Sequence, residues 1–382
     1  MLTHTQDKAF GLYIHWPFCQ SKCPYCDFNS HVAATIDQNR WKAAYLSEIS
    51  RIGRETRGRR LQSVFFGGGT PSLMQPDLVA AILDAVRATW SVANDWEVTL
   101  EANPGSVEAG RFSAYRQAGV NRISMGIQSL DDDALRKLGR LHTADDARVA
   151  FAIARGLFDR VSFDLIYARQ HQSLQDWEAE LRHALSLAID HISLYQLTIE
   201  DGTVFAERFR RGGLKGLPGE DLAADMFSLT REICADMGFP AYEVSNHARS
   251  GAESQHNLIY WRGDDYGGIG PGAHGRLPLP LGRHATVGHA QPGAWLQAVE
   301  TTGSGQETPV LMSEAEIAAE RIMMGLRLTS GILRQHAGVF VSEATINTLL
   351  CDGLIWSSPD QIGATDRGVL VLNHVIRTLL NA

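Results

Sequence analysis

The chain has 382 residues, of which 44% are hydrophobic and 20% are charged, and its formal net charge is −8. This length suits two or three domains, or one barrel with an appendage, and the acidic balance argues against a nucleic-acid partner, because phosphate binding needs a basic face. The sequence has no apolar run of about 18 residues and no signal-peptide pattern at its N-terminus, so we expect a cytoplasmic protein without a transmembrane segment.

Short apolar runs alternate with amphipathic stretches over the first 210 residues. A strand and a helix repeating at about 30 residues predict parallel strands joined by right-handed crossovers. Six such units predict a barrel or a partial (β/α)6 barrel in the α/β class, with a doubly wound open sheet as the alternative. The predicted strands are 11–15, 63–66, 97–101, 122–126, 160–165 and 191–197, and the predicted helices are 38–54, 76–90, 107–118, 143–155 and 174–188.

The pattern changes after residue 210. A loop at 211–219 precedes a helix at 221–237, and the Gly-, Pro- and His-rich segment 263–292 is predicted to be long and irregular. From residue 313 the chain is helical again, with a hairpin near 353–356 and a strand at 369–372 before a last helix. We therefore expect a barrel core at 1–210, a barrel-associated extension at 211–300 and a mainly helical, wing-like domain at 301–382. A wing can bind DNA, but the charge balance favours a packing role.

Three of the five cysteines, Cys19, Cys23 and Cys26, lie within the eight residues CQSKCPYC, directly after the first predicted strand. Thiolates at this spacing suit an iron–sulfur cluster, or a zinc ion with His15 or His31 as the fourth ligand. The letters C-P-Y-C also match a thioredoxin-type redox pair. The cluster interpretation is favoured, because three thiolates on four irons leave one iron open to a further ligand.

The remaining two cysteines, Cys234 and Cys351, are predicted to be small buried apolar residues. Five is an odd count, and a reducing compartment disfavours disulfides.

Polar residues recur near the ends of the predicted strands, where the functional sites of β/α barrels lie. The second strand ends in the glycines of FFGGGTPS, which let backbone approach a ligand closely. The third to sixth strands carry Glu101, Gln128, Asp164, Tyr195 and Gln196. Buried polar groups are costly when unpaired, so this set indicates a ligand site.

Two further motifs carry less weight. Arg140 in LGRLH can pair with a carboxylate of a cofactor or of an acidic substrate. GPGAHG, residues 270–275, matches a dinucleotide-binding fingerprint by its letters, but no helix is predicted after it, so that interpretation fails.

The C-x3-C-x2-C motif with Tyr25 before its last cysteine resembles the radical S-adenosylmethionine (SAM) superfamily. Within it, the chain resembles the oxygen-independent coproporphyrinogen III oxidase family, in its heme chaperone branch. The resemblance runs through YIHWPFC, FFGGGTPS, EANPG, GVNRISMGIQSL, LGRLH, DLIY, ISLYQLTIE, YEVSNHA, HNLIYW and GIGPGAHG, in that order.

This resemblance implies a [4Fe-4S] cluster on Cys19, Cys23 and Cys26, whose open iron chelates SAM, and a 5′-deoxyadenosyl radical when SAM is cleaved. The residues that it implies as cofactor-binding are Tyr13, Gly68, Gly69, Thr70, Glu101, Gln128, Arg140 and Asp164, with Tyr25, Gln196 and His274 as further candidates.

Phe28 separates two functions within the family. The coproporphyrinogen dehydrogenases, which decarboxylate two propionates to vinyl groups, have a fourth cysteine two residues after the third, where this chain has Phe28. They also carry a longer segment before the first cysteine. Both departures favour a chaperone that binds heme and delivers it to a hemoprotein, with the oxidase as the alternative and a radical SAM enzyme for an unrelated substrate as a third interpretation.

The resemblance also implies where heme binds. HNLIY, with His256, Asn257 and Tyr260, matches an H-N-x-x-Y motif associated with heme in the chaperone branch, and imidazole and phenolate are both axial heme ligands. The recipient hemoprotein is not encoded in any motif, although a respiratory-chain protein is a candidate. A homodimer and a peripheral association with the inner membrane are further expectations.

One loop departs from the family. After DLIY the family has Gly-Leu-Pro-Gly-Gln-Thr, whereas residues 168–173 here read Ala-Arg-Gln-His-Gln-Ser. The loss of two glycines and a proline puts the usual loop conformation in question.

Overall fold

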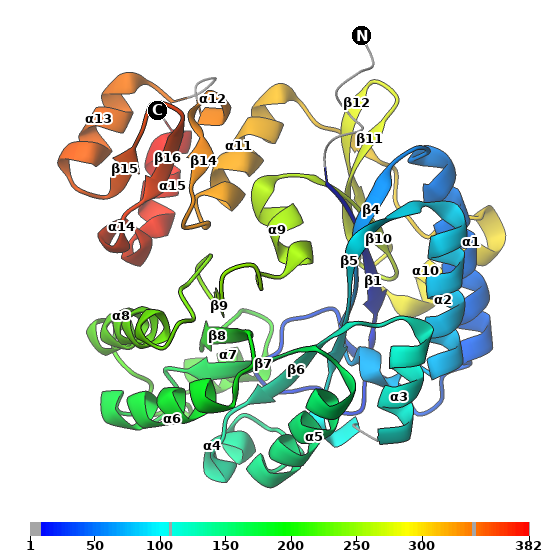
Figure 1. Ribbon diagram of the computed structural model, residues 1–382, viewed down its shortest axis with the longest axis horizontal. Helices are drawn as coiled ribbons and strands as arrows, with labels where there is room; N and C mark the ends of the chain where they lie inside the picture. The colour runs from blue at the N-terminus through cyan, green and yellow to red at the C-terminus, as the bar shows by residue number, and fades with distance from the viewer. Residues whose placement is uncertain (1–8, 107–108, 338–340, 382) are drawn as a thin grey trace.

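The protein is described by a computed structural model that covers residues 9–106, 109–337 and 341–381. Its centre is one curved sheet of eleven strands in the order β13-β12-β11-β10-β1-β4-β5-β6-β7-β8-β9 (Figure 1). The six predicted strands are consecutive in this sheet and pair in parallel: β1 (Phe10–Trp16), β4 (Arg60–Gly68), β5 (Ser91–Ala102), β6 (Arg122–Gln128), β7 (Arg160–Tyr167) and β8 (His191–Gln196).

Helices connect these strands and cover the outer side of the sheet, as the blue-to-green ribbons in Figure 1 show. The connecting helices are α1 (Gln38–Glu55), α2 (Pro76–Thr89), α3 (Ala109–Ala118), α5 (Ala144–Leu157) and α6 (Leu174–Leu187). Because the strand order ends at β9 and β13, which do not pair, the sheet is a partial barrel, as predicted. The first two residues of the helix predicted at 107–118 lie outside the described residues.

Successive side chains along each strand point to opposite faces of the sheet, and they form an apolar outer layer and a more polar inner face. In β1, Leu12 and Ile14 are fully buried in the main hydrophobic core together with Ile52 of α1. The intervening Tyr13 and His15 lie on the inner face, where the Tyr13 hydroxyl is 3.0 Å from His15 Nδ1. The core thus lies between sheet and helices, and the inner face is left for polar contacts.

The prediction of an irregular segment at 263–292 is wrong. β10 (Asp265–Ile269) pairs in parallel with β1, and β11 (His274–Leu279) and β12 (Gly282–Val287) form an antiparallel hairpin beside it. Glycines serve close approach between strands here, since a Cβ on Gly275 would lie 3.1 Å from the backbone nitrogen of Gly268. The GPGAHG motif is the turn from β10 into β11 and, as expected, no helix follows it.

The C-terminal part forms a separate small core, drawn in orange and red in Figure 1. Helices α11 (Glu314–Gly325), α13 (Glu343–Cys351) and α15 (Leu372–Leu380) pack against a three-stranded sheet of β14 (Ile332–Leu333), β16 (Gln361–Ala364) and β15 (Ile355–Ser357). This matches the expected mainly helical, wing-like domain.

Two predictions in this part are wrong. Residues 369–372 are not a strand but the junction of α14 (Asp366–Leu370) and α15, because Leu372, Val375 and Leu379 recur at helical spacing and are buried. Cys351 is exposed at the end of α13, whereas Cys234 is buried as predicted.

The remaining elements are short or connect these parts. They are β2 (Phe18–Cys19), β3 (His31–Val32), α4 (Asp132–Lys137), α7 (Val204–Arg210), α8 (Glu220–Asp236), β9 (Asn246–Ala248), α9 (Gln255–Arg262), α10 (Pro292–Thr302), β13 (Val310–Leu311) and α12 (Arg334–Ala337). Among the described residues, no helix combines the length and apolarity needed to span a bilayer.

Candidate functional site

The carboxyl ends of the parallel strands open into a cavity of about 320 Å³, which we call the mouth cavity. Its size falls in the range of about 300–1,000 Å³ that is usual for small-molecule sites. Most of the predicted site residues line it: Cys19, Cys23, Tyr25, Cys26, Gly68, Gly69, Thr70, Glu101, Gln128, Arg140, Asp164 and Gln196.

Each of the three predicted ligand sulfurs faces a polar side chain. Thr70 Oγ1 donates to Cys19 Sγ at 3.4 Å, and Arg140 Nη1 donates to Cys23 Sγ at 3.3 Å. Ser30 Oγ lies 3.9 Å from Cys26 Sγ. Burial raises the pKa of the Cys19 and Cys26 thiols, and the hydrogen bonds from Thr70 and Ser30 oppose that rise. Such donors stabilise thiolates, so this set fits ligands of an iron–sulfur cluster.

The alternatives for the cysteines find less support. The Cys23–Cys26 pair lies in an irregular loop and not at a helix N-terminus, where a thioredoxin-type pair belongs. The two histidines considered as a fourth zinc ligand, His15 and His31, turn Nε2 toward Asn29, at 2.9 and 3.0 Å, and not toward a cysteine sulfur.

The glycines after β4 bring their loop against the strand that leads to the cysteines. Gly68 has φ +115°, and a Cβ there would lie 2.8 Å from the carbonyl oxygen of Trp16. A Cβ on Gly69 would lie 2.7 Å from the carbonyl oxygen of Phe18. No side chain fits here, so both glycines hold Thr70 close to Cys19.

Two half-buried carboxyl groups, Glu101 and Asp164, line the mouth cavity. Burial, together with the nearby Asp164, raises the pKa of Glu101 to about 8, and burial raises that of Asp164 to about 6. Glu101 Oε2 accepts a 3.2 Å hydrogen bond from the backbone nitrogen of Gly68. The pair is ready to receive a positively charged ligand, which would favour ionisation of both groups.

Arg140 and Gln128 complete the wall between the carboxyl groups and the cysteines. Arg140 Nη2 donates to the carbonyl oxygen of Gly126 at 2.7 Å, which holds the guanidinium beside Cys23. Gln128 ends β6 with φ +75°, in the left-handed region that is uncommon for a side chain other than glycine. Strained backbone of this kind persists where the surroundings over-determine it, as they do at binding sites.

Three of the predicted residues, Tyr13, His256 and Tyr260, do not line the mouth cavity. His256 is 1% exposed, its Nδ1 is 2.7 Å from Ser63 Oγ, and its Nε2 is 2.6 Å from the Tyr260 hydroxyl. We call Ser63, His256 and Tyr260 the interior cluster. Burial and the charge of Arg122 lower the pKa of His256 to about 3, so the ring is neutral and both its nitrogens are occupied. Tyr13 stacks near this cluster, against Phe65, and does not line the mouth cavity.

Asn257 and His274 are also outside the mouth cavity. Asn257 is half-buried on α9 and hydrogen bonds to the Tyr242 side chain. His274 lies exposed on β11 and lines a neighbouring cavity with Phe28. The heme-motif residues therefore belong to the barrel interior and to α9, and not to the region around the cysteines.

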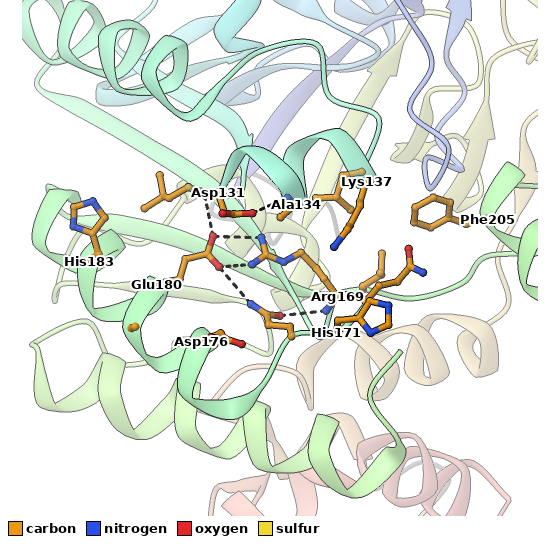
Figure 2. A pocket seen from close by; sticks show the side chains of 15 residues that line it. Asp131, Ala134, Lys137, Arg169, His171, Asp176, Glu180, His183 and Phe205 are labelled. Carbon is orange, nitrogen blue, oxygen red and sulfur yellow. Dashed lines mark hydrogen bonds and ion pairs between the residues drawn. The ribbon is translucent and has the colours of Figure 1, made fainter. Parts of the chain in front are cut away.

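In the loop that departs from the family, the two positions where the family has glycine have left-handed backbone. Ala168 has φ +57° and His171 has φ +61°. The loop borders a cavity of about 490 Å³ beside the mouth, which Figure 2 shows with Arg169 and Glu180 at its centre. The backbone at both positions therefore has a conformation that glycine favours, although neither residue is a glycine.

The charge gained by this loop is neutralised within the protein. Arg169 is 8% exposed and forms an ion pair with Glu180 of α6. Glu180 Oε1 also accepts from Ser129 Oγ at 2.7 Å and from the backbone nitrogen of Leu130 at 2.9 Å. One carboxylate thus joins the segments that follow β6 and β7.

Sequence reasoning missed Glu180, Ser30 and Lys22. Glu180 carries no local signal, because it lies within an ordinary amphipathic helix. Ser30 and Lys22 line the mouth cavity, and their positions in and just after the cysteine motif were the available signal.

Comparison with known proteins bears on the family and the fold. Residues 13–184 match the Radical SAM superfamily model, and that family implies a [4Fe-4S] cluster and SAM as cofactors. The fold matches the structure titled "Coproporphyrinogen III oxidase (HemN) from Escherichia coli is a Radical SAM enzyme", with a TM-score of 0.82 at 20% identity over 99% of this chain and 91% of the other. A likeness at that identity speaks for the fold alone.

Two curated relatives are similar over most of their lengths. The bovine (Bos taurus) protein named radical S-adenosyl methionine domain-containing protein 1, mitochondrial, is 41% identical over 95% of this chain and 82% of its own length. Heme chaperone HemW of Escherichia coli (strain K12) is 43% identical over 97% of this chain and 98% of its own length. The cysteine motif, the fold and this near-complete coverage agree, and the chain belongs to the HemW family of the radical SAM superfamily.

Proposed function

We propose that this protein is a heme chaperone, which binds heme and transfers it to a hemoprotein while holding a [4Fe-4S] cluster and SAM. The observation that carries the proposal is the 43% identity with the E. coli heme chaperone over nearly the full length of both chains. Phe28, where the dehydrogenases of the family have a fourth cysteine, supports a chaperone over the decarboxylating enzyme.

The cluster would be held by Cys19, Cys23 and Cys26. A cluster bound by three protein thiolates supplies an open iron that chelates SAM and an electron that can cleave it. Thr70 and Arg140 donate toward two of the sulfurs, which favours the thiolate form that ligation requires.

SAM would occupy the mouth cavity beside the cysteines. SAM has a positively charged sulfonium and an amino-acid end, and the cavity offers Glu101 and Asp164 to the positive charge and Arg140 to the carboxylate. The narrow loop at Gly68 and Gly69 leaves backbone close to the space where the amino-acid end would lie.

The test starts with anaerobic reconstitution with iron and sulfide. The protein receives reductant, SAM and coproporphyrinogen III, and mass spectrometry follows the loss of two CO2 per porphyrinogen. A parallel sample is titrated with heme and then mixed with an apo-hemoprotein. We expect stoichiometric heme binding, heme transfer and no decarboxylation. Turnover to the decarboxylated product would make this protein an oxidase, and an absence of heme binding would contradict the chaperone proposal.

A further inference from the structure

Another cavity, of about 430 Å³, lies between the cysteine loop (residues 20–30) and the β11–β12 hairpin. We call it the rim cavity. It shares Lys22, Asp27, Phe28 and Ser30 with the mouth cavity, so the two adjoin along the cysteine loop. We propose that heme binds in the rim cavity and that Nδ1 of His31 is a ligand of its iron. This inference rests on the proposed function and names the site of its cargo.

The hydrogen bonds around Asn29 fix the orientation of its amide. Asn29 Nδ2 donates to the carbonyl oxygens of Pro271 and Ala290, both at 2.9 Å. Carbonyl oxygens only accept, so the amide nitrogen must face them, and the amide oxygen must face His31.

The amide orientation in turn fixes the tautomer of His31. Asn29 Oδ1 lies 3.0 Å from His31 Nε2 and can only accept, so Nε2 carries the hydrogen. In a neutral imidazole the lone pair is then on Nδ1. Histidines that bind metals in proteins have this arrangement, with one nitrogen donating to an oxygen and the other facing the metal.

The other histidines near the barrel mouth are less suited to bind iron. Both ring nitrogens of His256 are hydrogen bonded in the interior cluster. His15 is similarly occupied, with Nδ1 beside the Tyr13 hydroxyl and Nε2 beside the Asn29 carbonyl. His274 lines the rim cavity, but no described residue hydrogen bonds to its ring to set its tautomer.

Two other residues of the lining, Phe28 and Lys22, suit a flat aromatic ring with two carboxylates. Phe28 is 61% exposed, which leaves a large aromatic face open for stacking against a porphyrin. Lys22 Nζ has only long hydrogen bonds, at 3.4 Å to the carbonyl oxygens of Phe28 and Ser30, and can turn to a propionate. A cavity at the rim leaves an edge of the porphyrin open, as a cargo that must be released requires.

The decisive variant is His31→Gln, studied in the cluster-loaded protein. The glutamine amide can donate to Asn29 as the imidazole does, so the loop keeps its hydrogen bond, but it has no ring nitrogen for iron. We expect heme affinity to fall by ~10–100-fold or more, the range seen when even a supporting residue of a metal ligand is removed. The Soret spectrum and the EPR signal of any residual ferric heme should change, because the axial ligand has changed.

Matched variants separate this inference from its alternatives. His284→Gln alters a half-buried histidine on β12 that does not line the rim cavity, and it should bind heme like the unaltered protein. Addition of free imidazole to His31→Gly should restore the Soret spectrum, which a purely structural role of His31 would not predict. Iron and sulfide content, measured for each variant, checks that the cluster is retained.

The outcomes are distinct. Heme binding by His31→Gln with unchanged affinity and spectrum overturns the inference while the chaperone proposal stands. The same holds if His256→Gln or His274→Gln loses heme and His31→Gln does not. If the unaltered protein binds no heme, the proposed function and this inference fail together.

Lys22 provides an independent arm. Exposed ion pairs contribute up to about 1 kcal/mol, so Lys22→Gln should weaken heme binding by only about two- to fivefold. The dimethyl ester of heme, which has no propionate charge, should bind Lys22→Gln and the unaltered protein equally. A full Lys22 effect on the ester would place the propionates elsewhere and contradict the proposed orientation.

Discussion

The mouth cavity and the interior cluster lie on the same inner face of the barrel, yet their polar groups are used differently. In the interior cluster, Ser63 and Tyr260 occupy both nitrogens of His256. In the mouth cavity, Glu101 and Asp164 are half-buried, neither forms an ion pair with a described residue, and their pKa values are raised. Polar groups that hydrogen bond to one another stabilise a fold, whereas unpaired polar groups that face a cavity indicate a binding site.

The largest expected effect is on the mouth cavity. Cys23→Ser should abolish the cluster absorbance and most of the bound iron and sulfide, since a hydroxyl does not replace a thiolate ligand. Cys351→Ser is the matched control, because Cys351 is exposed and lies in the C-terminal part. A full cluster in Cys23→Ser would overturn the assignment of the ligands.

A substitution in the Arg169–Glu180 pair should affect the stability of the fold, as in the interior cluster, because the two charges are paired with each other. Both side chains are about 10% exposed. Glu180→Ala leaves Arg169 buried and unpaired, so we expect a loss of about 3–5 kcal/mol in the free energy of unfolding. Denaturant titration measures it.

The double variant Arg169→Leu with Glu180→Gln sharpens this prediction. It removes the charge on both sides and keeps an acceptor for Ser129 and for the backbone nitrogen of Leu130. It should therefore lose less stability than Glu180→Ala alone. An equal or larger loss would mean that an unpaired Arg169 is not what destabilises Glu180→Ala, and that the ion pair itself stabilises the fold.

These two regions also differ in how far the sequence predicts them. The cysteine motif, the glycine turn and the strand-end carboxyl groups are local patterns, and they converge because parallel strands end at one edge. The burial of His256 depends on Ser63, which lies 193 positions away, so the local motif HNLIY could not reveal it. For the same reason, the pairing of β10 with β1 was missed, and a glycine-rich strand was taken for an irregular segment.

In the interior cluster, the prediction concerns acid stability. The pKa of His256 falls from 6.5 to about 3 on folding, so the unfolded chain binds a proton that the native protein excludes. The contribution of His256 is therefore complete above pH 6.5 and is lost as pH falls toward 3. His256→Gln should cost about 1–3 kcal/mol at pH 8 through lost hydrogen bonds.

The free energy of unfolding of His256→Gln should also decline less steeply than that of the unaltered protein between pH 6.5 and 4. Thermal or denaturant unfolding across this range measures both effects. An unchanged slope would mean that His256 is not held neutral.

In the mouth cavity, replacement of a carboxyl group should alter the affinity for a ligand and not the stability of the fold. Glu101→Gln retains an acceptor for the backbone nitrogen of Gly68 but removes a negative charge. SAM carries one more positive charge than S-adenosylhomocysteine, so the ratio of their affinities reports the carboxylates. We expect that ratio to fall about tenfold in the variant, which corresponds to about 1.4 kcal/mol.

This effect should depend on pH with a defined sign. The pKa values of Asp164 and Glu101 are about 6 and about 8, so the preference for SAM should grow as pH rises through this range. The pH dependence should be weaker in Glu101→Gln. Calorimetry with both ligands at several pH values measures it, and a pH-independent ratio would exclude a role for the carboxyl pair.

The smallest effect is expected where the loop after β7 borders the mouth. Ala168 has φ +57°, a conformation that costs a side-chain-bearing residue roughly 1–2 kcal/mol. Ala168→Gly removes that cost but makes the unfolded chain more flexible, so we expect a net stabilisation of about 1 kcal/mol or less. Gly156→Ala is the opposite control, because Gly156 lies in α5 with nothing within 4 Å of an added Cβ, and alanine should stabilise there. If Ala168→Gly destabilised the protein, the backbone at this position would not be the strained element, and the methyl group of Ala168, 4% exposed, would be stabilising through packing instead.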